Sequence, residues 1–276
     1  MVATVGNIQR YSGFSDIDHS DDPKKYVHRL DSTAALPVWQ AIKRRMLEYL
    51  AVRPGDRVLD VGCGTGTDSL AIGPLLGRTG QVVGIDSSVT MLSEASDRVA
   101  GRALPIEYCQ SDAQNLCFSD GSFDACRCER VLQHLDRPDR ALAEVARVTR
   151  RGGRIAFAEP DYGGLTIRGA DSHLTRQLID LRCEHFRSGK VGRQIVTCLS
   201  NLGMTNLRVT VVVDEHTELP DWYLDNLRRT YVAPAEEASI ISPADGVRWL
   251  SELQRSARLG QFRHAVPIFL VLGTKP

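Results

Sequence analysis

The stretch Asp60-Val61-Gly62-Cys63-Gly64-Thr65-Gly66 decides the fold. It ends a short apolar run that begins at Arg57, and such a run is typical of a buried strand in a parallel sheet. Glycines at every second position then predict a tight turn in which the backbone approaches a ligand closely. We therefore expect a strand, a ligand-binding turn and a helix, in that order.

Three kinds of ligand-binding turn compete at this position. A phosphate-binding P-loop needs a Lys followed by Ser or Thr after its last glycine, and Thr67-Asp68 stand there instead. A dinucleotide-binding turn needs the spacing GxGxxG, whereas GxGxG occurs here, which disfavours a nicotinamide-dependent oxidoreductase. The Asp60 carboxylate would repel a pyrophosphate but can pair with an ammonium group. The turn therefore favours an amino-acid conjugate of adenosine as the ligand.

A short apolar run followed by an amphipathic stretch recurs along the first 160 residues. The pattern predicts strands at 57–61, 81–86, 106–109, 123–128 and 154–158, and helices at 38–50, 67–77, 89–101 and 137–150. Strands that alternate with helices form a doubly wound, mostly parallel α/β sheet. Further on we expect a helical region at 172–202, a strand at 207–213, interrupted helices at 220–259 with an N-cap at Ser242-Pro243, and a last strand at 265–273.

Further motifs follow the glycine turn at the predicted strand ends. They are Asp86, Ser111-Asp112-Ala113, Gly121-Ser122-Phe123-Asp124 with Val131-Leu132-Gln133-His134-Leu135, and Arg151-Gly152-Gly153-Arg154. This ordered set, over about residues 38–160, resembles class I S-adenosylmethionine-dependent methyltransferases of the small-molecule type, as in ubiquinone/menaquinone or natural-product biosynthesis. The resemblance implies a Rossmann-like sheet of seven strands, whose last strand is antiparallel and lies between the fifth and the sixth.

The resemblance also implies S-adenosyl-L-methionine as cofactor and S-adenosyl-L-homocysteine as product. The glycine turn would wrap the methionine part, Asp86 would accept hydrogen bonds from the ribose hydroxyls, and Asp112 would accept one from the adenine amino group. As alternatives, Asp60 caps the following helix and Met91 packs in the core instead of covering the adenine. The expected cofactor-binding residues are Tyr26, Asp60, Gly62, Cys63, Gly64, Gly66, Asp86, Ser87, Met91, Asp112, Ala113 and Cys128.

Signals for catalysis and acceptor binding are weaker. His134 is a candidate general base near neutral pH, but Gln133 stands where many relatives carry another His, so no catalytic residue is assigned. Glu159 and Asp161 end the fifth predicted strand, where an acceptor can bind beside the cofactor. The expected substrate-side residues are Glu159, Asp161, Trp222, Tyr223 and Phe262.

The core sheet leaves two segments unexplained. We expect an N-terminal arm at 1–35 and a methyltransferase domain at 36–276, with a cofactor half at 36–160 and a substrate half at 161–276. The substrate half contains a helical insertion at 220–262. Arm and insertion both carry aromatic residues, which suit an apolar pocket, and we expect them to form a lid over the acceptor.

Composition narrows the function further. The 276 residues carry 34 Lys+Arg and 34 Asp+Glu, and this zero net charge argues against a nucleic-acid partner. Seven cysteines without a CxxC pair, and no metal-ligand spacing of His, Asp or Glu, predict no metal and fit a reducing, cytoplasmic compartment. The first residues lack an apolar core and no window holds 18 apolar residues, so we expect neither a signal peptide nor a membrane span.

These features together predict an enzyme that moves a methyl group to an O, N or C atom of a small organic molecule. Secondary-metabolite or quinone-type biosynthesis is the expected setting, and the protein is expected to be a monomer or a homodimer. A non-methylating cyclase or cofactor-binding protein on the same scaffold remains the alternative, because the motifs indicate cofactor binding and do not by themselves indicate transfer.

Overall fold

Eight strands form one sheet in the part of the chain described by the computed structural model, which is Phe14 and residues 16–276. The spatial order is β3-β2-β1-β4-β5-β8-β6, and β7 also pairs with β8. Neighbours among β1 to β5 are parallel, whereas β8 runs antiparallel to β5 and β7. The strands are β1 (Arg57–Val61), β2 (Gln81–Asp86), β3 (Ile106–Gln110), β4 (Phe123–Glu129), β5 (Thr149–Pro160), β6 (Thr166–Arg168), β7 (Thr205–His216) and β8 (Arg263–Thr274).

This topology confirms the predicted doubly wound sheet, with an antiparallel last strand between the fifth and the next long strand. One strand was not predicted. β8 extends beyond the end of β5, where Pro160 pairs with Ile268, and on this side its residues Arg263–Ala265 pair with the short strand β6. Three residues are too few to show a period of two in the sequence, so β6 had no readable signal.

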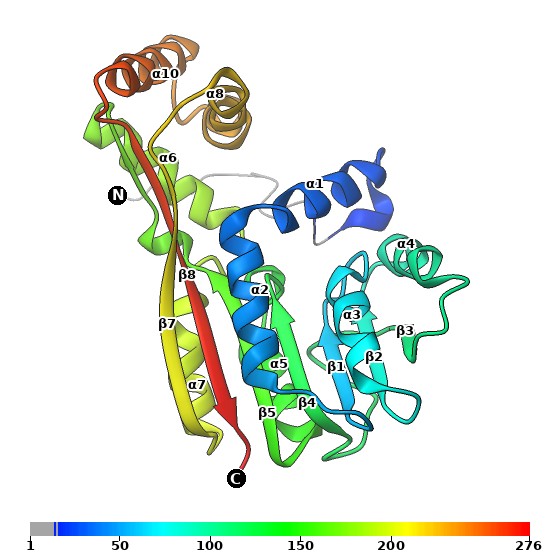
Figure 1. The fold of residues 1–276 in the computed structure, drawn as a ribbon. Coiled ribbons are helices and arrows are strands. Elements are labelled where there is room, and N and C mark those ends of the chain that lie inside the picture. Colours follow the sequence, from blue (N-terminus) through cyan, green and yellow to red (C-terminus); the bar gives the residue numbers. More distant parts are fainter. Residues whose placement is uncertain (1–13, 15) are drawn as a thin grey trace.

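Helices cover both faces of the sheet (Figure 1). Val58 of β1 packs in the core under α2 (Pro37–Leu50) and α3 (Thr67–Ile72), whereas Leu59 packs on the opposite face with α5 (Pro138–Val148) and α7 (Ile195–Asn201). This alternation follows from the strand period of two and explains why β1 is apolar on both sides. Cys126 and Cys128 of β4 are fully buried in the same core as Leu59, as small core residues. α4 (Val89–Val99) packs beside β2 and β3.

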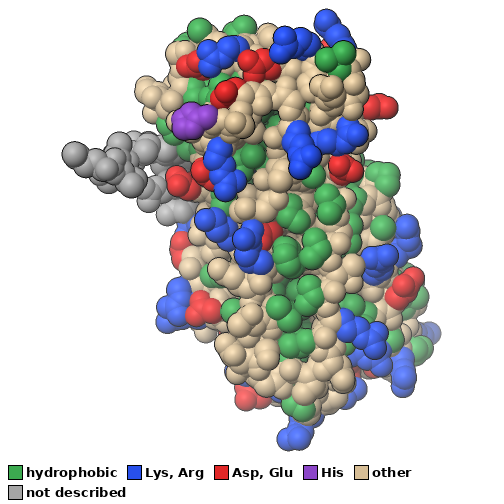
Figure 2. Space-filling model, turned by 90° about the vertical axis from the view of Figure 1, so that its left-hand side faces the viewer, with side chains coloured by type: hydrophobic (Ala, Val, Ile, Leu, Met, Phe, Trp, Pro, Cys, Tyr) green, Lys and Arg blue, Asp and Glu red, His purple; other side chains and the backbone are tan. Residues whose placement is uncertain are grey.

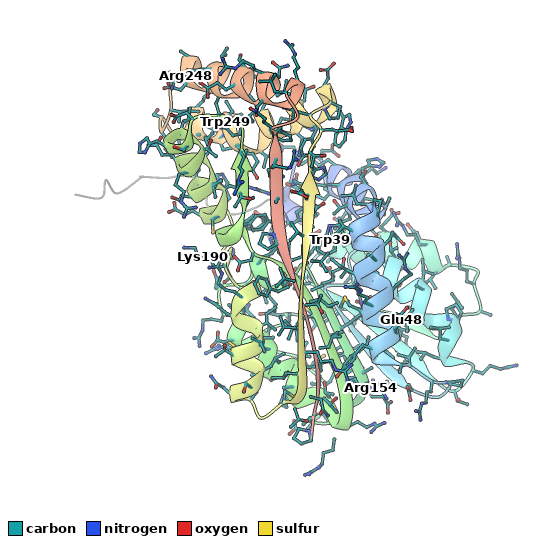
Figure 3. All side chains as sticks on the ribbon, turned by 60° about the vertical axis from the view of Figure 1, so that its left-hand side comes forward. Trp39, Glu48, Arg154, Lys190, Arg248 and Trp249 are labelled. Carbon is teal, nitrogen blue, oxygen red and sulfur yellow. The ribbon has the colours of Figure 1, made fainter. Side chains whose placement is uncertain are left out.

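A second helical layer stands beyond the carboxyl ends of the parallel strands (Figure 1). We call it the helical cap; it consists of α6 (Ser172–Glu184), α8 (Asp221–Leu227), the π-helix η7 (Arg228–Val232), α9 (Ala233–Glu237) and α10 (Pro243–Arg258). The cap has its own apolar core, in which Trp249 is fully buried and donates a hydrogen bond of 2.8 Å to Thr175 Oγ1 (Figure 3). α10 begins at the predicted N-cap Ser242.

The predicted helical region 172–202 is divided in two. α6 ends at Glu184 and α7 begins only at Ile195. Between them a Cβ on Gly189 would lie 2.4 Å from the carbonyl oxygen of Cys183, and one on Gly192 would lie 2.9 Å from that of Glu159. Backbones this close require glycine, so the chain turns here and α7 packs against the sheet while α6 joins the cap.

β7 forms an outer edge of the sheet and carries apolar side chains on its surface. Figure 2 views the molecule from this side and shows hydrophobic side chains gathered along it. Val209, Val211 and Val213 of β7 are exposed. Because alternate residues of a strand face the same side, these valines form one stripe.

Candidate functional site

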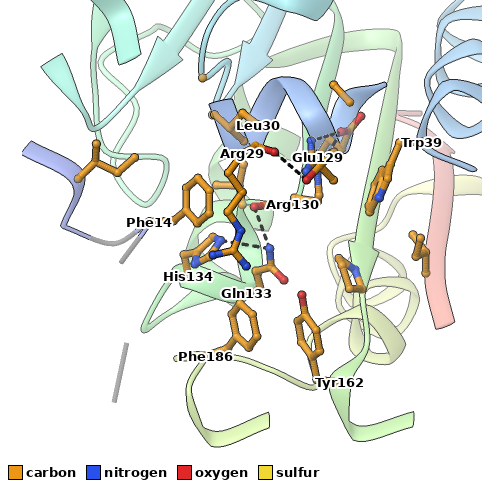
Figure 4. Close-up of a pocket in the computed structure, with 18 of the residues that line it drawn as sticks. Phe14, Arg29, Leu30, Trp39, Glu129, Arg130, Gln133, His134, Tyr162 and Phe186 are labelled. Atoms are coloured by element: carbon orange, nitrogen blue, oxygen red, sulfur yellow. Dashed lines mark hydrogen bonds and ion pairs between the residues drawn. The ribbon is translucent and has the colours of Figure 1, made fainter. Parts of the chain in front are cut away.

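A cavity of about 750 Å³ lies between the carboxyl ends of the parallel strands and the helices above them. Its walls come from the glycine turn and the ends of β2 and β4, from the arm helix α1 (Lys24–Ala34), and from α6, α8 and η7. Figure 4 shows part of this wall, with Arg29 and Leu30 of α1 near Glu129 and His134. The carboxyl edge of an open α/β sheet is where such folds bind their ligands. A cavity of this size suits a nucleoside-sized ligand together with a second small molecule.

Close packing fixes the glycine turn. Gly62 has φ of +65°, and a Cβ there would lie 2.2 Å from Val131 Cγ2. Gly66 has φ of +75°, and a Cβ there would lie 2.3 Å from the hydroxyl of Tyr108. Both positions therefore require glycine for their backbone conformation and for space. Gly62, Cys63 and Gly64 line the cavity, whereas Gly66 lies behind it.

Asp86, at the end of β2, connects the turn to the next strand. Its Oδ2 accepts a hydrogen bond of 2.9 Å from Gly64 N and its Oδ1 accepts one of 3.0 Å from Ser88 N. The carboxylate lines the cavity, and burial raises its pKa against the lowering effect of these two hydrogen bonds. Each carboxylate oxygen retains a lone pair that can accept a further hydrogen bond.

Four other expected cofactor residues surround Asp86 on the cavity wall. They are Ser87, Met91, Asp112 and Ala113. Met91 is fully buried and packs with Ile17 and Val27 of the arm. Asp112 accepts a hydrogen bond of 2.8 Å from Gln114 N, which orients its carboxylate in the loop after β3. The structure therefore brings together an acidic group on each of two neighbouring strand ends and an apolar surface between them.

Asp60 does not face the cavity. Its carboxylate is fully buried, where Oδ1 accepts a hydrogen bond of 2.7 Å from Arg127 and Oδ2 accepts one of 2.7 Å from Ser69. Arg127 also pairs with Asp68 at 3.0 Å and with Glu129 at 2.9 Å. The expected pairing of Asp60 with a ligand ammonium group is corrected, because the protein itself neutralises this carboxylate.

Other predicted residues also lie outside the cavity wall. Cys128 and Phe262 are fully buried in the two apolar cores. Asp161 is fully buried and forms a bidentate ion pair with Arg193, so it is not available to orient an acceptor. Tyr26 packs edge-on against Phe14, with ring centroids 5.0 Å apart, and does not line the cavity.

Glu159 supports the site from behind instead of facing an acceptor. Its Oε1 accepts hydrogen bonds of 2.7 Å from both Val131 N and Leu132 N, at the start of the 3₁₀ turn η4 (Leu132–His134). Oε2 has no hydrogen-bond partner among the described residues. Burial raises the pKa of Glu159 to about 8, although the backbone hydrogen bonds lower it. The group therefore carries its proton at neutral pH.

His134 does line the cavity. Its ring lies between Phe14 and Phe186, at centroid distances of 5.8 and 5.6 Å, and its Nε2 lies 3.1 Å from Gln133 Nε2. Burial and the nearby Arg182 and other arginines lower its pKa to about 3. The imidazole is neutral at pH 7, and its low basicity makes it a weak candidate for a general base.

The cap and β8 together form a polar cluster around His264 that the sequence did not indicate. Trp222 and Tyr223 line the cavity as their positions in the insertion suggested, although Trp222 remains 64% exposed. Tyr223 Oη lies 2.8 Å from Nδ1 of His264, and Tyr231 Oη lies 2.8 Å from its Nε2. Burial and His216 lower the pKa of His264 to about 4, so the ring is neutral. A neutral imidazole donates through one nitrogen only, which leaves one of the two tyrosine hydroxyl protons free to donate into the cavity.

The described part of the arm is tied to the site. Asp18 accepts hydrogen bonds of 2.6 Å from Ser88 Oγ, 2.8 Å from Val89 N and 3.1 Å from Thr90 N, at the start of α4. Burial raises the pKa of Asp18, but the hydrogen bonds from Ser88, Thr90 and Val89 outweigh it and hold the pKa at about 2. An acidic group at a helix N-terminus also suits the helix dipole. The part of the predicted arm that falls on residues 1–13 and 15 lies outside the described residues.

The described residues contain neither a candidate membrane-spanning helix nor a candidate metal site. No helix found there has the length and apolar character needed to cross a membrane. No group of three or more His, Cys, Asp or Glu side chains gathers there in a way that would hold a metal ion. The expectation that the reaction needs no metal stays a prediction.

Comparison with known proteins places this site in context. A family model described as a methyltransferase domain matches residues 59–157. The chain is 35% identical over 253 residues to an uncharacterized 37.1 kDa protein in transposon TN4556 of Streptomyces fradiae, over 89% of this chain and 70% of that protein. It is 34% identical over 128 residues to the ubiquinone/menaquinone biosynthesis C-methyltransferase UbiE of Bdellovibrio bacteriovorus, over 46% of this chain and 54% of that enzyme.

A solved structure shares the fold. It is phosphoethanolamine N-methyltransferase 2 of Haemonchus contortus in complex with phosphomonomethylethanolamine and S-adenosylhomocysteine, with a TM-score of 0.61 at 18% identity. The likeness covers 96% of this chain and 61% of that one.

Proposed function

Because the chain belongs to the class I S-adenosylmethionine-dependent methyltransferases, we propose that it transfers the methyl group of this cofactor to an O, N or C atom of a small organic molecule. We further propose that the reaction serves secondary-metabolite or quinone-type biosynthesis. The UbiE relative supports the second point only in general terms, since the match spans about half of that enzyme.

One observation carries the proposal: the Asp86 carboxylate accepts the Gly64 N–H and still faces the cavity. A carboxylate held this way can accept hydrogen bonds from two ribose hydroxyls, while Gly62 to Gly64 leave the backbone open to the rest of the cofactor. Asp112 would accept a hydrogen bond from the adenine amino group, and Met91 would cover the adenine face. These residues fit S-adenosylmethionine in the type and order of their polar groups.

The chain's residues mainly bind and orient the reactants. When bound, S-adenosylmethionine supplies an electrophilic methyl group, which a lone pair of the acceptor takes as the carbon–sulfur bond breaks and its electron pair passes to sulfur. Placing the acceptor in line with that bond is worth up to roughly 7–11 kcal/mol of the barrier in favourable cases. The walls formed by α1, α6 and α8 would limit the access of water to the aligned reactants. An acceptor with an O–H or N–H group releases its proton to solvent or to a neighbouring base.

The arm and the insertion are proposed to act as a lid. α1, in the arm 1–35, supplies Arg29, Leu30 and Thr33 to the cavity wall, and the insertion 220–262 supplies Trp222, Tyr223 and Tyr231. The methyltransferase domain would then be 36–276, divided into a cofactor half at 36–160 and a substrate half at 161–276. Removal of residues 1–20 should impair turnover far more than folding, because it removes the Asp18 contact with α4.

Calorimetric titration of the protein with S-adenosylmethionine tests the cofactor site. Asp86→Ala removes two charge-assisted hydrogen bonds worth about 1.5–3 kcal/mol each, so the affinity should fall by about 100-fold or more. Asp97→Ala, which changes an exposed carboxylate on the neighbouring helix α4, is the matched control and should bind as the wild type does. Equal affinities of the Asp86 variant and the wild type would contradict the proposed site.

Transfer is tested separately from binding. Incubation with methyl-labelled cofactor and candidate acceptors, followed by mass spectrometry, should reveal a labelled product and S-adenosylhomocysteine in equal amounts. Tight cofactor binding with conversion of an acceptor but no labelled product would favour the non-methylating cyclase instead.

A further inference from the structure

Two arginines face the cavity without any acidic partner. Arg29 of α1 and Arg182 of α6 both line the cavity, and no described carboxylate lies within 4.0 Å of either guanidinium. Residues 1–13 and 15, which the structure does not describe, contain no Asp or Glu. Neither guanidinium donates a hydrogen bond to a described residue.

The other cations on the wall are paired. Lys43, Arg127 and Arg130 lie 3.0, 2.9 and 3.1 Å from the carboxylate of Glu129, and Arg187 pairs with Asp136. The positive charge that no described carboxylate balances therefore lies where Arg29 and Arg182 line the cavity. Donors of this strength that lack an acceptor in the protein indicate a ligand that supplies one.

The two unpaired arginines also influence each other. The side chain of Arg29 is exposed, and desolvation by the protein around it lowers its pKa. Arg182 lowers the pKa of Arg29 further by charge repulsion, as does Arg229. A bound anion would relieve this repulsion, and functional sites are where such unfavourable charge is found.

Aromatic rings hold both guanidinium groups in place. Tyr162 and Phe186 stack with centroids 4.1 Å apart and planes at 8°, and Arg182 Cζ lies 4.7 Å from the centre of Phe186. Arg29 Cζ lies 5.5 Å from the centre of Phe14, and Figure 4 shows its side chain reaching from α1 toward His134. A guanidinium that lies over a ring can keep the N–H donors along its edge free for a planar anion.

We propose that the methyl acceptor is a small anion, a carboxylate or phosphate on a flat apolar body, whose charged group is bound by Arg29 and Arg182. The proposal rests on the proposed function, because it assigns this part of the cavity to the acceptor. Leu30, next to Arg29, lies against Gly64 of the glycine turn, so the arginines border the proposed cofactor site. Phe14, Phe186 and Tyr162 would contact the flat body of the acceptor.

The test measures binding to protein saturated with S-adenosylhomocysteine. Calorimetry compares benzoate with benzamide, indole-3-acetate with indole-3-acetamide, and phenyl phosphate with phenol. We expect at least one acid to bind about tenfold or more tightly than its neutral partner. The two carboxylates and the phosphate are separate arms, so the preferred anion is identified in the same series.

Variants assign the effect to the two arginines. Arg29→Gln and Arg182→Gln should each reduce acid binding about tenfold without changing the affinity for the neutral partner or for S-adenosylhomocysteine. Arg182→Lys keeps the charge but loses the planar fork, and should retain part of the preference. Arg176→Gln, on the same helix but 63% exposed and paired with Asp180, is the matched control and should behave as the wild type.

Several outcomes would overturn the inference. They are equal binding of acids and neutral partners, unchanged acid binding by both Gln variants, or binding of none of the acids while S-adenosylhomocysteine still binds. If the wild type fails to bind S-adenosylhomocysteine, the proposed function itself fails, and this result is separate from the comparison of the acids.

Discussion

The glycine turn faces the same cavity as the part of the wall that carries Arg29 and Arg182, which we call the arginine wall. The two regions are built in different ways. The turn and Asp86 belong to short segments that follow neighbouring strands, and they present backbone groups and carboxylates. The wall is assembled from side chains of α1, of η5 (Tyr162–Gly164), of α6 and of Phe186 just after α6, and α1 is far in the sequence from the other three. A site made by local backbone geometry leaves a pattern in the sequence, whereas a site made by packed side chains does not.

The two regions also treat charge differently. Next to the turn, Arg127 compensates Asp60, Asp68 and Glu129 within the protein. On the wall, Arg29 and Arg182 have no carboxylate among the described residues. We infer that the first charges stabilise the fold around the turn and that the second are available to a ligand.

The largest expected effect tests the ion pairs that Arg127 forms with carboxylates next to the glycine turn. Arg127→Met removes the cation that three buried or partly buried carboxylates share. Lys43 still pairs with Asp68 and Glu129, and Arg130 with Glu129, but Asp60 keeps no cation. Breaking a buried ion pair in this way typically costs about 3–5 kcal/mol. The free energy of unfolding, from urea denaturation, should fall by that amount. Arg137→Met, which breaks the exposed pair with Asp139, should change it by less than about 1 kcal/mol. Similar losses in the two variants would remove the distinction between the regions.

A smaller effect tests whether packing or backbone conformation fixes the turn. Gly62 and Gly101 both have positive φ, +65° and +73°, but a Cβ at Gly62 would strike Val131 whereas one at Gly101 meets nothing within 4 Å. Gly101→Ala should therefore cost only the backbone strain, roughly 1–2 kcal/mol. Gly62→Ala should cost about 1–3 kcal/mol more, because the added methyl group overpacks a full site, and should also weaken cofactor binding. If thermal unfolding gives the same loss of stability for Gly62→Ala and Gly101→Ala, backbone conformation alone fixes the turn.

The same difference between the two regions explains which features could be predicted from the sequence. The five parallel strands and the glycine turn were predicted because short apolar runs and glycine spacing record local constraints, whereas Asp86 and Asp112 were predicted from the resemblance of their motifs to a known family. Carboxylates at strand ends were harder to place. Asp60, Glu159 and Asp161 all follow or end strands, but their partners Arg127, Val131 N and Arg193 come from other parts of the chain. Spacing alone cannot tell a carboxylate that faces a ligand from one that is paired internally.

The arginine wall could not be predicted from the sequence for the same physical reason. Arg29 and Arg182 lie on amphipathic helices, where an arginine is usually a solvated surface residue. Only the fold brings them onto one cavity. His264 was one of several scattered histidines, and its two tyrosine partners became visible only once α8 and η7 were placed beside β8.

Glu159 offers a test at the junction of the two regions, since it holds η4 between Val131, which packs on Gly62, and His134, which faces the arginine wall. Its pKa is raised from 4.5 to about 8 in the folded protein, so the stability it contributes is fully present below pH 4.5 and is lost as the pH rises through 8.

Glu159→Gln keeps the accepting oxygen for Val131 N and Leu132 N but cannot ionise. Between pH 6 and 7 the wild type should therefore lose about 1 kcal/mol of unfolding free energy relative to the variant, as measured by urea denaturation at each pH. Glu107→Gln, at an exposed position on β3, should follow the wild type across this range. If the unfolding free energies of Glu159→Gln and the wild type change in parallel with pH, Glu159 is ionised in the folded protein. The group that joins the two regions would then be a charged carboxylate, and its Oε2 would need a partner that the described residues do not supply.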